Sequence, residues 1–88
     1  MQADLSIPDN RFIDLFNLCN ALIKADYKAS LNEDLHYLLI SIPAKKKFTI
    51  KICRRGHIQA LGRFPASLAE KIINELNAKF IKKFIRGT

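Results

Sequence analysis

The sequence predicts one α+β domain spanning residues 1–88, built from an N-terminal helix, an antiparallel meander of three to five strands and a long C-terminal helix on the same sheet face. Apolar side chains recur at the 3.6-residue spacing of an amphipathic helix in residues 12–23 and again from residue 69 onward. Residues 48–61 instead alternate with the period of two that half-buried strands show. A chain of 88 residues has room for a single hydrophobic core.

The N-terminal half is predicted to contain a short β-like segment, a helix and an edge strand. Residues 3–8 have the β-like character. Pro8 supplies a turn, and Asp9 is suited to cap a helix by accepting the N–H groups of its first turn. The helix covers residues 12–23, with apolar side chains on one side and polar ones on the other. Residues 27–31 alternate, which indicates an edge strand.

Residues 36–64 are predicted to form a three-stranded antiparallel meander. Residues 36–42 are β-prone and almost continuously apolar, and the proline and lysines that follow break this run as a turn would. Residues 48–53 alternate strictly, Gly56 supplies a positive φ for the next connection, and the third strand runs to Gly62. The side chains expected beneath the helices are Phe48, Ile50, Ile52, Ile58 and Ala60.

The last element is predicted to be one long helix. Pro65 suits a first helical turn, and Ser67 is a suitable cap for a slightly later start. An apolar stripe runs from Ala69 to Phe84, and Gly87 provides the stop. Basic residues gather near the C-terminal end, where positive charge complements the helix dipole. The alternative explanation is a basic amphipathic helix that binds a membrane surface. The apolar stripe is better explained as a helix that packs on the core and whose end is partly exposed, so we expect no membrane partner.

The distribution of charge predicts a polyanionic partner. Residues 1–44 carry three basic and six acidic side chains, a net charge of −3. Residues 45–88 carry twelve basic and two acidic side chains, a net charge of +10. Such a concentration of positive charge is typical of proteins that bind nucleic acid or an acidic surface.

Several classes of function lack support in the sequence. The three glycines do not have the spacing of a phosphate-binding loop and the carboxylates are scattered, so we expect no enzyme, no cofactor and no small-molecule substrate. Cys19, His36, Cys53 and His57 could be considered as the four ligands of a zinc site. We expect no metal site, because Cys19 belongs to the apolar stripe of the first helix, where a thiol is ordinary core. No apolar run reaches ~18 residues and the N-terminus lacks signal-peptide features. Two cysteines are typical of free thiols in a reducing, cytoplasmic compartment.

The sheet face turned away from the helices is the candidate binding site. We expect it to carry short or mildly apolar side chains, with cations at its margins. Lys and Arg would neutralise phosphates, while Gln59 and its small neighbours would read bases to a limited extent. The expected partner is nucleic acid, with double-stranded DNA as the first candidate and RNA as the alternative that the sequence leaves open. The candidate contact residues are Lys45, Lys46, Lys47, Thr49, Lys51, Arg54, Arg55, His57, Gln59, Leu61 and Arg63.

The order of elements resembles one half-repeat of the TATA-box-binding protein family, a curved antiparallel sheet with helices on its convex side. The nearest local match is residues 36–42 and 48–53, then Gly56 and Gly62 with five residues between them, then the helix. The same fold occurs as the N-terminal substrate-binding domain of ribonuclease HIII. The resemblance implies that DNA faces Lys51, Cys53, Gln59 and Leu61. In that family, phenylalanines wedge into the DNA and kink it; the corresponding positions fall near His36 and Cys53, neither of which is phenylalanine. A single half-repeat would have to form a homodimer to cover a comparable length of DNA.

A second resemblance covers residues 47–64 and the helix that follows. This stretch is similar to the ethylene-response-factor and phage-integrase arm-binding domains, which enter the major groove with a three-stranded sheet. It implies contacts from the same sheet by Lys51, Arg54, Arg55, His57 and Gln59. The alternative function is a protein–protein interaction module, an adaptor or inhibitor, whose basic face meets an acidic protein.

Overall fold

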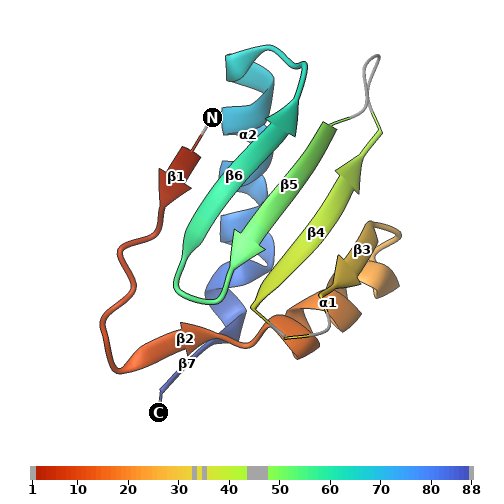
Figure 1. Cartoon of the computed structure of the whole chain (residues 1–88). Coiled ribbons are helices and arrows are strands. Elements are labelled where there is room, and N and C mark those ends of the chain that lie inside the picture. Colours follow the sequence, from red (N-terminus) through yellow and green to blue (C-terminus); the bar gives the residue numbers. More distant parts are fainter. Residues whose placement is uncertain (1, 33, 35, 44–47, 88) are drawn as a thin grey trace.

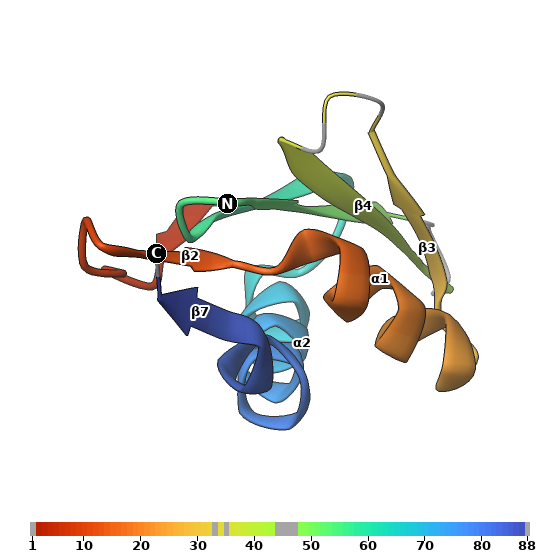
Figure 2. The same ribbon diagram turned by 90° about the horizontal axis from the view of Figure 1, so that it is seen from below.

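A five-stranded antiparallel sheet forms the centre of this α+β fold, and both helices lie on one of its faces (Figures 1 and 2). The structure, a computed structural model, describes residues 2–32, 34, 36–43 and 48–87. In chain order the elements are β1 (Gln2–Asp4), β2 (Arg11–Ile13), α1 (Leu15–Lys24), β3 (Lys28–Leu31), β4 (Tyr37–Ile42), β5 (Phe48–Cys53), β6 (His57–Gly62), α2 (Ala66–Lys79), the 3-10 helix η1 (Ile81–Phe84) and β7 (Ile85–Gly87). The sheet has the strand order β1-β6-β5-β4-β3, and β2 pairs separately with β7. Within the described part of the chain, no helix is long and apolar enough to cross a membrane.

The three central strands confirm the predicted meander. β5 pairs antiparallel with β4 on one side and β6 on the other, with Ile50 opposite both Ile40 and Ala60. Buried and half-buried residues alternate along the whole of β5. The buried side chains of this face join those of α1 and α2 in one core. All the side chains predicted to lie beneath the helices are buried, namely Phe48, Ile50, Ile52, Ile58 and Ala60.

Two short strands complete the edges of the sheet. β3 pairs with β4, with Ala29 opposite Ile40, which confirms the predicted edge strand. At the other edge β1 pairs with β6, but it ends at Asp4 instead of continuing through residues 3–8. Asp4 Oδ1 accepts a hydrogen bond from the backbone N–H of Ser6 at 2.8 Å, and Ser6 has a φ of 54°. This local turn takes the chain out of the strand.

The first helix begins later than the sequence predicts. β2 replaces the predicted first turn, and α1 starts at Leu15 with Asp14 as its N-cap. Asp14 Oδ1 accepts a hydrogen bond from the backbone N–H of Asn17 at 3.3 Å, which is the role predicted for Asp9. Phe12 therefore belongs to a strand and not to the helical stripe. The reason is tertiary, because the backbone of this segment hydrogen-bonds with β7, a partner more than seventy residues away in the sequence.

The second helix is shorter than predicted, and the segment after it forms different structure. α2 begins directly after Pro65, so Ser67 lies within the helix and is not its cap. After α2 the chain forms η1 and then β7, so Phe84 is outside the helix and Gly87 is a strand residue instead of a helix stop. Burial of Ile81 in the core and the pairing of β7 with β2 hold this segment in place.

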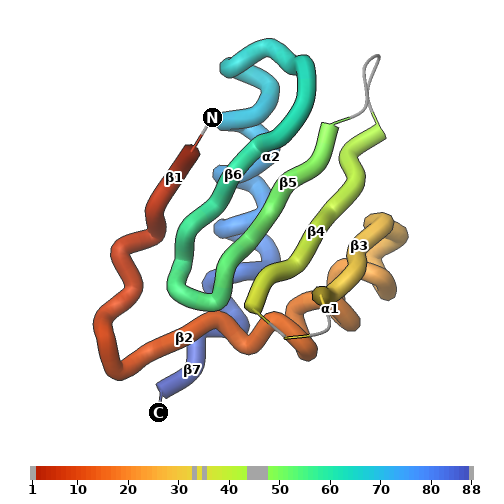
Figure 3. Tube along the Cα trace, viewed as in Figure 1, coloured from red at the N-terminus to blue at the C-terminus, as the bar shows by residue number. Residues whose placement is uncertain are grey.

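The segment between β1 and β2 passes close to the turn between β5 and β6, and Gly56 is the point of contact (Figure 3). The backbone N–H of Leu5 donates to the Gly56 carbonyl at 3.1 Å. Gly56 has a φ of +94°, as predicted for this turn. A Cβ at this position would lie 2.9 Å from Ile7 Cδ1 and 3.1 Å from Ile7 Cγ1. The backbone conformation and the close approach therefore both require glycine.

Gly56→Ala is expected to lower the free energy of unfolding by roughly 1–3 kcal/mol, because a side chain at positive φ is strained and Ile7 must move. Urea unfolding followed by circular dichroism measures the change. Gly87→Ala is the matched control, since a Cβ there meets nothing within 4 Å. We expect that control to change the free energy by less than about 0.5 kcal/mol. Equal losses from the two substitutions would contradict this role of Gly56.

Asp14 links the start of α1 to the C-terminal segment and makes stability depend on pH. Its pKa is held below the ordinary value of 3.8, first by the hydrogen bond that Asn17 Nδ2 donates to Asp14 Oδ2 at 2.6 Å. The Arg86 guanidinium, with Nε 3.6 Å from the same oxygen, lowers the pKa further. The unfolded chain thus binds the proton more tightly than the folded one. The resulting stabilisation is present above about pH 3.8 and is lost as the pH falls through the lowered pKa.

We expect the native chain to lose more free energy of unfolding between pH 6 and pH 2.5 than Asp14→Asn loses. Asparagine keeps a capping oxygen but has no carboxylate to protonate, so its contribution does not change over this range. Urea unfolding of both proteins at the two pH values measures the difference. If both lose the same amount, Asp14 does not contribute to the acid sensitivity of the fold.

Candidate nucleic-acid interface

The sheet face opposite the helices, here called the open face, is left uncovered by α1 and α2 (Figure 2). In its middle row Lys51 lies between Leu39 of β4 and Gln59 of β6, and Gln59 is paired with Gln2 at the sheet edge. Strand alternation and register assign the open-face side chains as Gln2, Asp4, Lys28, Ser30, Tyr37, Leu39, Ser41, Thr49, Lys51, Cys53, His57, Gln59 and Leu61.

The structure confirms that the outward residues of β5 and β6 share this face. Thr49 is paired with Leu61, and Cys53 at the other end of β5 is paired with Tyr37. Leu61 is 45% exposed, whereas Thr49 and Cys53 are half-buried by their neighbours. At these positions the open face carries short or apolar side chains, as the alternation predicts.

The open face carries only a weak positive charge. Its basic side chains are Lys28 and Lys51, and Asp4 is the acidic one among the residues assigned to it. Lys51 Nζ lies 4.5 Å from the centre of the Tyr37 ring, a cation–π contact at the middle of the face. Asp4 Oδ2 lies 3.4 Å from His57 Nδ1, so both groups have a partner within the chain.

The basic residues of the second half of the chain do not gather on this face. Several belong to α2, η1 and β7 and not to the five-stranded sheet, namely Lys71, Lys79, Lys82, Lys83 and Arg86. Lys79 is paired with Glu75 at 2.8 Å and Arg86 with Asp14 at 3.6 Å. The net charge of +10 therefore overstates the charge available to one partner. The candidate residues Lys45, Lys46 and Lys47 lie outside the described residues.

Two further candidates, Arg54 and Arg63, lie at the margins of the open face. Arg54 follows β5 directly and is exposed, and its guanidinium lies 4.6 Å from the centre of the Phe12 ring. Arg63 follows β6 at the opposite end of the sheet and is also exposed. The two arginines therefore flank the open face at its opposite ends.

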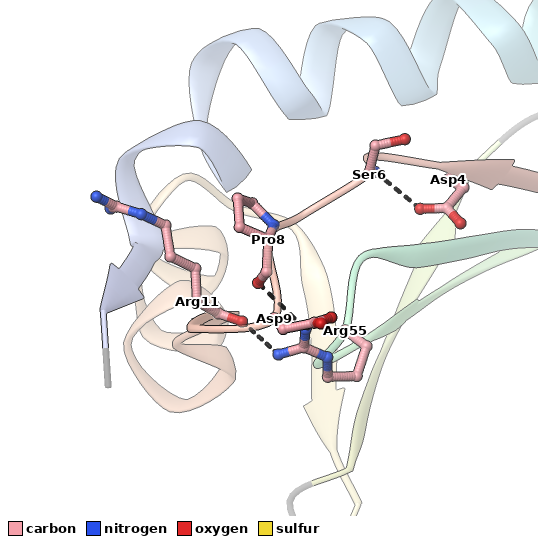
Figure 4. Close-up of polar contacts among 6 residues, drawn as sticks. All are labelled: Asp4, Ser6, Pro8, Asp9, Arg11 and Arg55. Carbon is pink, nitrogen blue, oxygen red and sulfur yellow. Dashed lines mark hydrogen bonds and ion pairs between the residues drawn. The ribbon is translucent and has the colours of Figure 1, made fainter.

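Arg55 has a structural role that the sequence does not reveal (Figure 4). Its Nη1 donates to the carbonyl of Arg11, and its Nη2 donates to the carbonyl of Pro8 at 3.2 Å. Asp9 Oδ1 lies 3.9 Å from the same Nη2. Arg55 thus fastens the β5–β6 turn to the segment that leads into β2, and both terminal nitrogens of its guanidinium donate within the chain.

Tyr37 is an open-face residue that sequence analysis did not single out. Residues 36–42 are almost continuously apolar, so their alternation is hidden until the strand is paired. The structure buries Leu38 and Ile40 and directs Tyr37 and Leu39 to the open face. The one signal in the sequence was the tyrosine itself, because its polar hydroxyl favours a position that is partly exposed.

Of the four residues considered as metal ligands, Cys19 lies apart from the other three, which line one hollow at the end of the open face. Cys19 is buried in the core beneath the sheet, and burial raises the pKa of its thiol. Cys53 lies on the open face, away from the core. Among the residues that the structure describes, no three His, Cys, Asp or Glu side chains are grouped so that they could hold a metal ion.

In comparisons with known proteins, no family model, no curated protein and no solved structure matches this chain. Its function is therefore inferred from geometry. Two features bear on it, an uncovered sheet face with one acidic side chain among its assigned residues, and arginines at the two ends of that face.

Arg55→Ala is expected to lower the free energy of unfolding by about 1–2 kcal/mol, because two carbonyl groups lose their donor. Thermal and urea unfolding measure the loss. Arg63→Ala removes another exposed arginine, outside the turn, and should cost less than about 0.5 kcal/mol. Indistinguishable stabilities of the two variants would rule out the fastening role of Arg55.

Proposed function

We propose that this chain is a small, non-catalytic nucleic-acid-binding protein that holds DNA or RNA against the open face. The observation that carries the proposal is the placement of both helices on one side of the sheet, which leaves the other side free for a partner. Asp4, the acidic residue assigned to the open face, is paired with His57, so little on that face repels a polyanion.

The proposed contacts divide into phosphate-binding and base-reading groups. Lys51 at the centre and Arg54 and Arg63 at the ends would neutralise phosphates, together with residues 45–47, which precede β5. Gln59, with short neighbours such as Thr49, would lie near the bases. Arg55 would contribute by holding the turn in place and not by contacting phosphate.

The order of the elements supports the resemblance to a TATA-box-binding half-repeat. The chain has a first strand, a helix, four further strands of the same sheet and a second helix, with both helices on one face. On this resemblance double-stranded DNA is the preferred partner, and a homodimer would present two open faces to it.

A protein–protein interaction module is the second candidate function. Leu61 is 45% exposed, and Leu39 lies in the middle row of the same face. Apolar side chains among cations are also what an acidic protein partner would contact. Nucleic acid and an acidic protein are distinguished by the salt dependence of binding and by direct competition.

Binding to a short DNA duplex is expected to weaken steeply with salt. If about five phosphates are neutralised, the logarithm of the association constant should fall with the logarithm of salt concentration at a slope of about −4 to −5. Lys51→Gln removes the central charge of the open face and should make that slope shallower by about 0.9. Fluorescence anisotropy titrations between 50 and 200 mM NaCl measure both slopes.

Lys71→Gln is the matched control, because Lys71 is an exposed lysine of α2, outside the sheet. It removes the same charge and should leave the slope of the native chain unchanged. A salt-independent affinity, or equal effects of the two substitutions, would overturn the proposed function. A stoichiometric acidic protein partner, with no nucleic-acid binding at low salt, would establish the second candidate instead.

A further inference from the structure

A hollow of about 440 Å³ lies at the end of the open face, beside the turn from β5 to β6. This volume falls within the range of about 300–1,000 Å³ that is usual for small-molecule sites. The lining combines two aromatic rings, two imidazoles, two guanidinium groups and a thiol, which belong to Phe12, Tyr37, His36, His57, Arg54, Arg55 and Cys53. None of the residues that line the hollow is acidic.

Each aromatic ring of this hollow already stands beside a cation. The Arg54 guanidinium lies 4.6 Å from the Phe12 ring centre, and Lys51 Nζ lies 4.5 Å from the Tyr37 ring centre. Aromatic rings interleaved with Lys and Arg are the means by which proteins hold unpaired nucleotides, because a base stacks on the ring while its phosphate meets the cation. A duplex uses the faces of its bases for its own stacking and offers only their edges.

Three separate segments hold the walls of the hollow in a fixed arrangement. The backbone N–H of Ile13 donates to the Arg54 carbonyl at 2.9 Å, and the backbone N–H of Arg54 donates to the His36 carbonyl at 3.1 Å. Arg55 fastens the same turn to the segment before β2. Phe12, Arg54 and His36 are therefore positioned before any ligand arrives, which reduces the entropy lost on binding.

We infer that this hollow holds an unpaired nucleotide, with its base stacked on Tyr37 or Phe12 and its phosphate at Arg54. The inference rests on the proposed function and assigns its substrate class. The preferred ligand is a single strand, in place of the duplex that the family resemblance implies. The base would enter at the end of the sheet, and the strand would continue along the open face past Lys51.

The test compares a labelled ten-nucleotide oligothymidylate with a labelled DNA hairpin closed by a non-nucleotide linker, in which every base is paired, at one salt concentration, by fluorescence anisotropy. We expect the oligothymidylate to bind the native chain more tightly. Tyr37→Leu should weaken that binding by about 5- to 150-fold, the range that loss of one base–aromatic stack causes, and change hairpin binding less than about 2-fold. Tyr37→Phe keeps the ring and should bind the single strand as the native chain does.

A second measurement does not depend on the stability of the Tyr37 variants. The chain has two tyrosines and no tryptophan, so Tyr27→Phe leaves Tyr37 as the only source of tyrosine fluorescence. Tyr27 packs edge-on against Phe80, and phenylalanine keeps that ring contact. We expect oligothymidylate to quench the fluorescence of this variant and the hairpin to leave it unchanged.

The two proposals fail in different ways. Tighter binding of the hairpin, equal losses on both ligands with Tyr37→Leu, or unquenched fluorescence at saturating oligothymidylate would overturn the inference and leave the proposed function standing. If neither nucleic acid binds at low salt, the proposed function itself is wrong.

Discussion

The burial of one face of the sheet beneath two helices is the constraint on which the rest of the structure depends. Alternation in β5 and β6 sends Ile50, Ile52 and Ile58 into a core that also takes Leu18 and Leu76 from the helices. Each such side chain contributes about 1.5–3 kcal/mol on burial. Successive residues of a strand point to opposite faces, so the same alternation directs the intervening side chains away from the core. Two helices cover one face of this sheet, and the other face is left uncovered.

The segments outside the main sheet define the margin of the open face. β2 pairs with β7, so residues 11–13 lie beside the C-terminal end of the described chain, and Asp14 and Arg86 add an ion pair beside them. Arg55 and Gly56 bring the segment before β2 against the β5–β6 turn. These contacts place Phe12 beside Arg54 and so form the aromatic and cationic wall of the hollow. Packing that stabilises the fold thus also builds the candidate site.

The candidate site was predictable where it depends on strand alternation and not where it depends on contacts between distant segments. Thr49, Lys51 and Gln59 lie on one face because neighbouring strands carry their patterns in register. Phe12 and Tyr37 escaped prediction, since one belongs to a strand with no local signal and the other to a run without visible alternation. Charge was misleading in a related way. The net +10 of the second half is a property of composition, whereas the fold divides those cations between the sheet and the segments beyond it.

The sequence by itself determined the α+β class, the central meander, the edge strand β3 and the buried side chains of β5 and β6, because periodicity and turn chemistry act over a few neighbouring positions. In α1 the predicted apolar stripe is buried only in part, since Phe16 is 60% and Ile23 51% exposed. Only the tertiary structure decided where each helix begins or ends near the termini. The backbone N–H and C=O groups of residues 11–13 and 85–87 need hydrogen-bond partners, which either a helix or a strand would provide. Because the two segments pair with each other, both are strands. Two segments so far apart meet only once the core has formed, and no local pattern records that meeting.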